Sequence, residues 1–196
     1  MDHADGFARE EYAARTGRVL ERMAELRLDA LLVTAPENTH YLCGYQTKAV
    51  FTFQFLLLLR SGAMHLVTRE MEKVNAGDAA ARGMVGDFTL YGDDQDPMEV
   101  AAAAIAKLCA GQGRIGIERA SWTMSAQRAD DLARLCPSLD WVDASALVDR
   151  LRLVKSPAEL ACIRKAASIT DLISARAVAA VAPGVAVKVT LVPRSK

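Results

Sequence analysis

Residues 151–166, LRLVKSPAELACIRKA, divide this 196-residue chain into two parts of unlike character. Ser156 is suited to a helix N-cap and Pro157 to the first helical turn. Glu159 stands three residues after the cap, where its side chain can close a capping box. These residues predict that an amphipathic helix begins at Pro157, and most of the chain lies ahead of this start.

The sequence before residue 151 alternates between short apolar runs and longer amphipathic runs. Helices are predicted over 9–26, 70–82, 97–109, 125–136 and 143–153, with a short helix or turn from Pro36. Strands are predicted over 29–35, 49–60, 63–68, 88–91, 114–118 and 139–142. Two of these strands meet at Ser61-Gly62, which indicates an antiparallel hairpin. This alternation predicts an α/β fold with one mixed, mostly six-stranded sheet and helices on both faces.

Composition and charge exclude several classes of protein. The chain is 52% hydrophobic, and its 24 basic and 24 acidic residues cancel, so no net charge favours nucleic acid or an anionic membrane. The apolar run 49–59 is shorter than the ~20 residues of a membrane-spanning helix. The acidic N-terminus, MDHADGFARE, lacks the apolar core of a signal peptide. We therefore expect a cytoplasmic protein without nucleic-acid or membrane partners, and reduced cysteines rather than disulfides, although the even number of four permits them.

Residues 111–116, GQGRIG, match the GxGxxG pattern of dinucleotide-binding proteins. That fingerprint follows a strand and opens a helix, whereas here a predicted helix precedes it and a predicted strand follows. We expect these glycines to end the helix instead. Glu118 lies at the end of the next strand, where ribonuclease-H-type nucleases place a metal-binding carboxylate. The further acids and the basic surface that a nuclease needs are not visible in the sequence.

Metal-binding patterns are also weak. No histidine stands at ligand spacing with another histidine, a cysteine or a carboxylate, although a ligand role for two of them stays open. A cluster of acids precedes Pro97, where capping of the next helix explains it better than a metal does. We expect no metal and no other cofactor in this chain. The residues considered are His3, His40 and His65, and the acids Asp93, Asp94 and Asp96.

Four motifs, in this order, resemble the creatinase/prolidase (Xaa-Pro aminopeptidase) metallohydrolases. They are Asn-x-x-Tyr-Leu-x-Gly-Tyr at 38–45, Ile-Gly-Ile-Glu at 115–118, the junction LRLVKSPAEL at 151–160 and Pro-Gly-Val at 183–185. In that family a non-catalytic, ribonuclease-H-like N-terminal domain precedes a "pita-bread" catalytic domain. The resemblance implies that residues 1–153 form the N-terminal domain and 154–185 the junction and first helix of a missing C-terminal catalytic domain.

The tail 186–196 departs from the family pattern and contains Leu-Val-Pro-Arg, a thrombin recognition sequence. We interpret it as vector-derived, with a natural C-terminal strand as the alternative.

The resemblance also implies a function. The whole protein would hydrolyse a C–N bond in a small peptide or in an amidino or amide substrate. Its two divalent metals (Mn, Co or Zn) would be held in the missing domain. The creatinases are the exception in this family, because they contain no metal. This chain would then be inactive alone and contribute homodimer formation and substrate selection. The alternative is a stand-alone small-molecule-binding or interaction domain of the same fold without catalysis.

Candidate substrate-contact residues follow from the same resemblance. In creatinases and their relatives, residues shortly after the Gly-aromatic pair reach across the dimer and line the neighbouring active site. The creatinase pattern has a Phe and an Arg there, but residues 46–59 contain no Arg, which speaks against creatine as the substrate. A purely structural alternative is an amphipathic strand that packs its phenylalanines, Phe51, Phe53 and Phe55, on the core. The candidates for contact in trans are Tyr45, Lys48, Phe51, Phe53 and Gln54.

Overall fold

The computed structural model describes residues 7–49 and 51–184 and divides the chain into two compact units, Met1–Val154 and Lys155–Lys196. In the first unit, helices and strands alternate as the sequence predicts. Its helices are α1 (Arg9–Glu25), α2 (Pro36–Cys43), the 3-10 helix η1 (Glu70–Glu72), α3 (Lys73–Ala81), α4 (Pro97–Leu108), α5 (Ala126–Leu135) and α6 (Leu147–Leu153). Its strands are β1 (Ala30–Val33), β2 (Phe55–Leu59), β3 (Met64–Arg69), β4 (Asp87–Tyr91), β5 (Gly113–Ile117) and β6 (Leu139–Asp143).

The strands form one six-stranded sheet in the order β4-β3-β2-β1-β5-β6. Only β2 runs against its neighbours; the other adjacent pairs within the described residues are parallel. The pairs Val33–Leu56 and Leu58–Met64 set the register of β2. The carboxyl ends of the other five strands and the amino end of β2 therefore lie at one edge of the sheet. This confirms the predicted α/β class, the mixed sheet and the hairpin.

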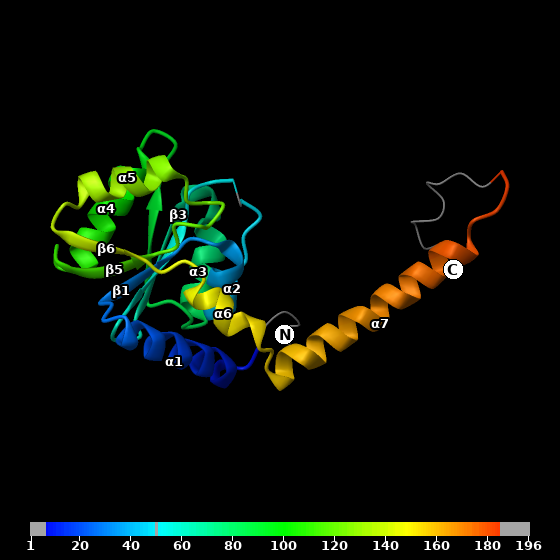
Figure 1. Cartoon of the computed structure of the whole chain (residues 1–196). Coiled ribbons are helices and arrows are strands. Elements are labelled where there is room, and N and C mark those ends of the chain that lie inside the picture. Colours follow the sequence, from blue (N-terminus) through cyan, green and yellow to red (C-terminus); the bar gives the residue numbers. More distant parts are fainter. Residues whose placement is uncertain (1–6, 50, 185–196) are drawn as a thin grey trace. The chain divides into compact units, whose positions relative to one another are not determined.

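Helices cover both faces of the sheet, as predicted (Figure 1). Side chains alternate between the faces along each strand, so Leu31 and Val33 contact the layer of α1, α2, α3 and α6. Ala30 and Leu32 face the opposite layer, formed by α4 and α5. Each fully buried Leu or Val contributes about 1.5–3 kcal/mol to folding through apolar burial.

The predicted strand 49–60 is wrong in its first half, because β2 begins only at Phe55. Its pairing partner β1 ends at Val33, opposite Leu56, so the residues before Phe55 have no strand on the β1 side, although β3 continues to Arg69 on the other side. A turn forms instead, in which the Ala49 carbonyl accepts hydrogen bonds from the Thr52 amide (3.1 Å) and the Thr52 hydroxyl (2.8 Å).

The glycine-rich segment 111–116 links a helix to a strand, in the order predicted. Gly111 has a φ of +68°, and its amide donates to the Ala106 carbonyl at 2.8 Å, which ends α4. The strand β5 then begins at Gly113.

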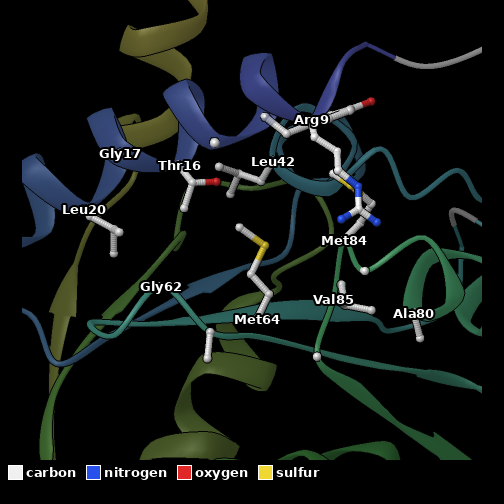
Figure 2. Close-up of a pocket in the computed structure, with 15 residues that line it drawn as sticks. Arg9, Thr16, Gly17, Leu20, Leu42, Gly62, Met64, Ala80, Met84 and Val85 are labelled. Carbon is white, nitrogen blue, oxygen red and sulfur yellow. The ribbon is translucent and has the colours of Figure 1, made fainter.

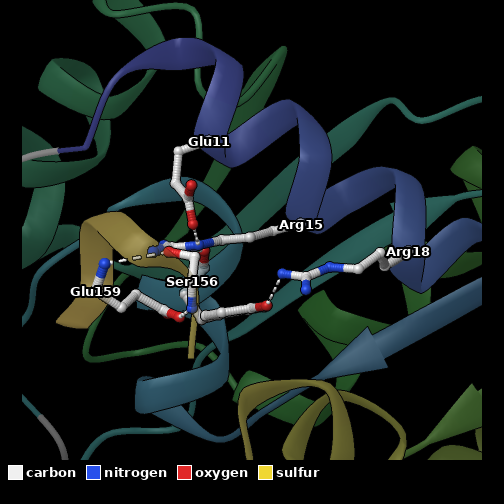
Figure 3. Close-up of polar contacts among 6 residues, drawn as sticks. Glu11, Arg15, Arg18, Ser156 and Glu159 are labelled. Atoms are coloured by element: carbon white, nitrogen blue, oxygen red, sulfur yellow. Dashed lines mark hydrogen bonds and ion pairs between the residues drawn. The ribbon is translucent and has the colours of Figure 1, made fainter. Parts of the chain in front are cut away.

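The second unit contains α7 (Pro157–Ala179), with the predicted capping box at its start (Figure 3). The Ser156 hydroxyl accepts from the Glu159 amide at 3.1 Å, and the Glu159 carboxylate accepts from the Ser156 amide at 2.8 Å. Within residues 7–49 and 51–184, no helix is both long and apolar enough to cross a membrane. Val185 and the tail 186–196 lie outside the described residues.

Candidate functional site

The candidate site is the loop that joins α2 to β2 at the carboxyl edge of the sheet. α2 ends at Gly44, whose φ of +66° is left-handed and whose amide donates to the His40 carbonyl at 2.8 Å. A Cβ at this position would lie 2.6 Å from the Tyr12 hydroxyl oxygen, so only glycine fits here. The turn at Gly44 directs the chain into Tyr45 and the loop.

A buried polar cluster closes the two ends of this loop. We call it the base network: it consists of the buried residues Tyr45, Gln54, Thr68 and Glu72, and of Asn75, which joins it from the exposed side of α3. The Tyr45 hydroxyl lies 3.1 Å from Gln54 Oε1 and 3.0 Å from Glu72 Oε2. The Thr68 hydroxyl donates to Gln54 Oε1 at 3.1 Å, and Asn75 Nδ2 donates to Glu72 Oε2 at 2.9 Å. Burial raises the pKa of Tyr45, so its hydroxyl keeps its proton and acts as a donor.

Between these ends lies a loop tip, which we define as residues 46–49, 51 and 52. Gln46, Lys48 and Phe51 are exposed here, and 89% of Phe51 is accessible. The Thr47 hydroxyl accepts from the Ala49 amide at 2.9 Å, so the turn at the tip carries its own hydrogen bonds. The assignment of Phe51 to the core is therefore wrong.

The five sequence candidates thus lie in one loop but in two environments. Lys48 and Phe51 are exposed at the tip, whereas Tyr45, Phe53 and Gln54 are buried at its base. Phe53 packs with Phe55, in agreement with a core role for both rings, and its carbonyl accepts a hydrogen bond from the Tyr91 hydroxyl. The Arg128 guanidinium also lies 5.0 Å from the centre of the Phe53 ring.

Glu118, considered above as a nuclease-type ligand, is used entirely within the fold. Its Oε2 accepts from the amides of Thr34 (2.7 Å) and Ala35 (2.9 Å), and its Oε1 accepts from Asn38 Nδ2 (2.7 Å). Burial raises the pKa of Glu118, and these three donors act in the opposite direction. Asn38 Oδ1 in turn accepts from Arg152 Nη1 at 2.7 Å. The carboxylate therefore ties the start of α2 to the end of β5 and, through Asn38, to α6.

Across residues 7–49 and 51–184, no group of three or more His, Cys, Asp and Glu side chains could hold a metal ion. His40 lies in α2 and His65 in β3, where its Nε2 contacts the Thr89 hydroxyl at 2.8 Å. Burial lowers the pKa of both histidines. Asp96 caps α4 through the Met98 amide, as predicted.

A cavity of about 710 Å³ lies apart from the loop, between α1, β3 and the segment before β4. The side chains of Arg9, Thr16 and Met64 point into it (Figure 2). The Arg9 guanidinium also passes close to Gly83 and donates a hydrogen bond to the Arg82 carbonyl. No sequence candidate lines this cavity.

α1 is joined to α2 by a buried arginine that the sequence analysis missed. Only 1% of Arg15 is exposed, and its Nε lies 3.1 Å from the Glu11 carboxylate (Figure 3). Its Nη1 donates to the Tyr41 carbonyl at 3.0 Å, while Arg18 donates to the Tyr41 hydroxyl at 2.8 Å. The Arg15 guanidinium also lies 4.1 Å from the centre of the Phe7 ring. The i, i+4 spacing of Glu11 and Arg15 was the only local signal.

The family model described as the creatinase/prolidase N-terminal domain matches residues 15–154, which is most of the chain. This chain belongs to the creatinase/prolidase N-terminal domain family.

The first curated relatives of this creatinase/prolidase N-terminal domain are about twice as long as the chain. An ectoine hydrolase of Halomonas elongata is 30% identical over 185 residues, which cover 91% of this chain and 46% of that protein. The dipeptidase PepE of Mycobacterium ulcerans is 25% identical with a TM-score of 0.67, over 91% of this chain and 46% of that one. A Xaa-Pro dipeptidase from Bacillus anthracis, 20% identical, shares the fold with a TM-score of 0.69 over 92% and 47%. The chain spans about half the length of the curated relatives it matches.

Three of the motifs that carry the resemblance contact one another in this creatinase/prolidase N-terminal domain. Asn38 comes from the first motif, Glu118 from the second and Arg152 from the junction, and the hydrogen bonds described above join them in a row. The sequence alone does not reveal this contact, because 80 and 114 residues separate Asn38 from its two partners.

Thr68 and Glu72 were also missed. For Thr68 a signal existed, since the hairpin pairs Phe55 with Val67, and one further step places Gln54 opposite Thr68. For Glu72 no local pattern distinguishes it from the neighbouring exposed acid Glu70.

Proposed function

We propose that this chain is the non-catalytic N-terminal domain of a homodimeric hydrolase that cleaves a C–N bond in a small peptide, amidino or amide substrate. In this proposal the loop tip contributes to substrate selection by presenting Lys48 and Phe51 to the active site of the partner subunit. The observation that supports it is an exposed cation and an exposed aromatic ring on a loop whose two ends are buried and hydrogen-bonded.

The chemistry of the two side chains suits this role. A Lys ammonium can pair with a carboxylate, such as the one at the end of a dipeptide. A phenyl ring buries a large apolar area once a partner surface covers it, so the exposed Phe51 can add to binding when it is covered. The relatives named dipeptidase and ectoine hydrolase support hydrolysis as the reaction of the whole protein.

The catalytic groups belong, in the same proposal, to a second domain that begins with α7. Two divalent metals (Mn, Co or Zn) would be held there, since the described residues of this chain form no such site. In this proposal Tyr45, Phe53 and Gln54 support the loop from its base, because each is buried within its own subunit.

Replacing Lys48 by Ala in the full-length protein should raise KM about tenfold, or 1.4 kcal/mol, and leave kcat and metal content unchanged. The reason is that the ammonium binds substrate without touching the metal-activated water. Steady-state kinetics on the best dipeptide or amide substrate measure this. Lys73→Ala, an exposed lysine at the start of α3, is the matched control and should have no effect. An unchanged KM in Lys48→Ala would remove the lysine from the proposed contact.

The 196-residue chain alone should hydrolyse neither Xaa-Pro dipeptides nor creatine, with or without added Mn²⁺ or Co²⁺. A sensitive amine-release assay on the purified chain measures this. Metal-dependent turnover that disappears when one of the chain's own carboxylates is replaced would contradict the proposal.

The second candidate function is a stand-alone small-molecule-binding domain, and the 710 Å³ cavity beside α1 is the observation that favours it. The length of the native gene separates the two. An open reading frame about twice as long as this chain supports the hydrolase, and one that ends with this chain supports the binding domain.

A further inference from the structure

We infer that Glu72 is a positioning residue that fixes the conformation of the loop tip. It does so by holding the base network together through Tyr45. The purpose of this positioning rests on the proposed function of the loop tip, whereas the hydrogen-bonded connection itself does not.

Glu72 occupies an unusual place for an acid. It lies in η1, between β3 and α3, and only 5% of it is exposed. Two donors converge on its Oε2, the Tyr45 hydroxyl at 3.0 Å and Asn75 Nδ2 at 2.9 Å. A buried carboxylate is tolerated only where donors compensate for its lost hydration, so this pairing is strongly constrained.

The Tyr45 hydroxyl joins Glu72 to both ends of the loop. Tyr45 itself precedes the loop tip, and its single proton faces Gln54 Oε1 as well as Glu72. Gln54 follows the tip. One hydroxyl group therefore connects the entry to the loop, the exit from it and η1.

From Gln54 the connection continues into the tip itself. Gln54 Nε2 donates to the Ala49 carbonyl at 3.4 Å, and this carbonyl also accepts the two hydrogen bonds of Thr52 that form the turn. Hydrogen bonds thus run from Glu72 through Tyr45 and Gln54 to Ala49, next to Lys48. Loss of the carboxylate should loosen the turn while the sheet, held by its own ladders, stays intact.

Amide hydrogen exchange on the 196-residue chain tests this directly. In Glu72→Ala, the amides of Ala49 and Thr52 should exchange about fivefold faster, the effect of losing one hydrogen bond of ~1 kcal/mol. The amide of Leu57, in β2, should be unchanged. Glu70→Ala removes an exposed acid from the same 3-10 helix and should leave all three amides unchanged.

Two further variants separate hydrogen bonding from charge and from packing. Glu72→Gln keeps a carbonyl oxygen that can accept from both donors and should restore most of the protection. Tyr45→Phe should behave as Glu72→Ala does. If Glu72→Ala does not fold, Tyr45→Phe tests the same hydrogen-bonded connection in its place. Its control is Tyr12→Phe, because the buried Tyr12 hydroxyl has no hydrogen-bond partner among the described residues.

Kinetics of the full-length protein supply the functional readout. Glu72→Ala should raise KM about threefold to tenfold without changing kcat, and Glu72→Gln should restore it. Unchanged exchange at Ala49 and Thr52 in both Glu72→Ala and Tyr45→Phe would overturn the inference. So would an unchanged KM in Glu72→Ala when Lys48→Ala raises it. Faster exchange together with an unaffected KM in Lys48→Ala would instead support the connection and refute the proposed function.

Discussion

Glu118→Ala is expected to lower the free energy of unfolding by about 3–5 kcal/mol, because it leaves three buried donors without an acceptor. These donors are the amides of Thr34 and Ala35 and the side-chain amide of Asn38. Urea denaturation followed by circular dichroism measures the change. Acetate or formate should restore part of the loss in this variant alone, since either anion can occupy the space of the missing carboxylate.

Two matched variants show whether the hydrogen bonds are responsible. Glu37→Ala removes an exposed negative charge from the first turn of α2, the helix whose start Glu118 holds. This variant should lose at most about 1 kcal/mol of unfolding free energy. Glu118→Gln should fall between the two, because its carbonyl can accept from both backbone amides while its amide group opposes Asn38. Equal losses in Glu118→Ala and Glu37→Ala would show that the carboxylate is not the anchor of α2.

Phe53→Ala is expected to destabilise the domain by about 3–5 kcal/mol, whereas Phe51→Ala should change stability by less than about 0.5 kcal/mol. The two variants remove the same atoms two residues apart, but 2% of Phe53 is exposed against 89% of Phe51. In the full-length protein Phe51→Ala should raise KM about tenfold with normal folding. Urea denaturation and steady-state kinetics measure the two effects.

Two outcomes would contradict the predictions for Phe51 and Phe53. If Phe51→Ala unfolds the domain as readily as Phe53→Ala does, the ring belongs to a core that the isolated chain does not show. If Phe51→Ala leaves both stability and KM unchanged, the exposed ring has no part in substrate selection.

The elements that the sequence predicted well are those specified by neighbouring residues. The capping box depends on two nearby side chains, those of Ser156 and Glu159. The hairpin at Ser61-Gly62 and the helix end at Gly111 depend on a backbone conformation that favours glycine. The order of helices and strands follows from the spacing of apolar residues, and this was enough to place six strands in one sheet.

The parts that it could not predict depend on residues far apart in the chain. Apolar periodicity extended the predicted strand to residue 49, whereas β2 begins at Phe55 and a turn between Ala49 and Thr52 precedes it. Glu118 was recognised as a carboxylate at a strand end, but its partners at 34, 35 and 38 became visible only in the folded domain. In the same way, the motif supplied five candidates, and only burial separated exposed Lys48 and Phe51 from the three at the base.

The reversed direction of β2 has a consequence for how such a domain can diversify. Because β2 is antiparallel to β1, the chain leaves and re-enters the sheet at the same edge, and Tyr45 and Gln54 close the excursion at its root. Residues inserted between them would lengthen the tip without shifting any strand register. Doubling the number of residues adds only about 0.6 kcal/mol of closure entropy. Reach and sequence at the tip can therefore evolve independently of the scaffold that carries them.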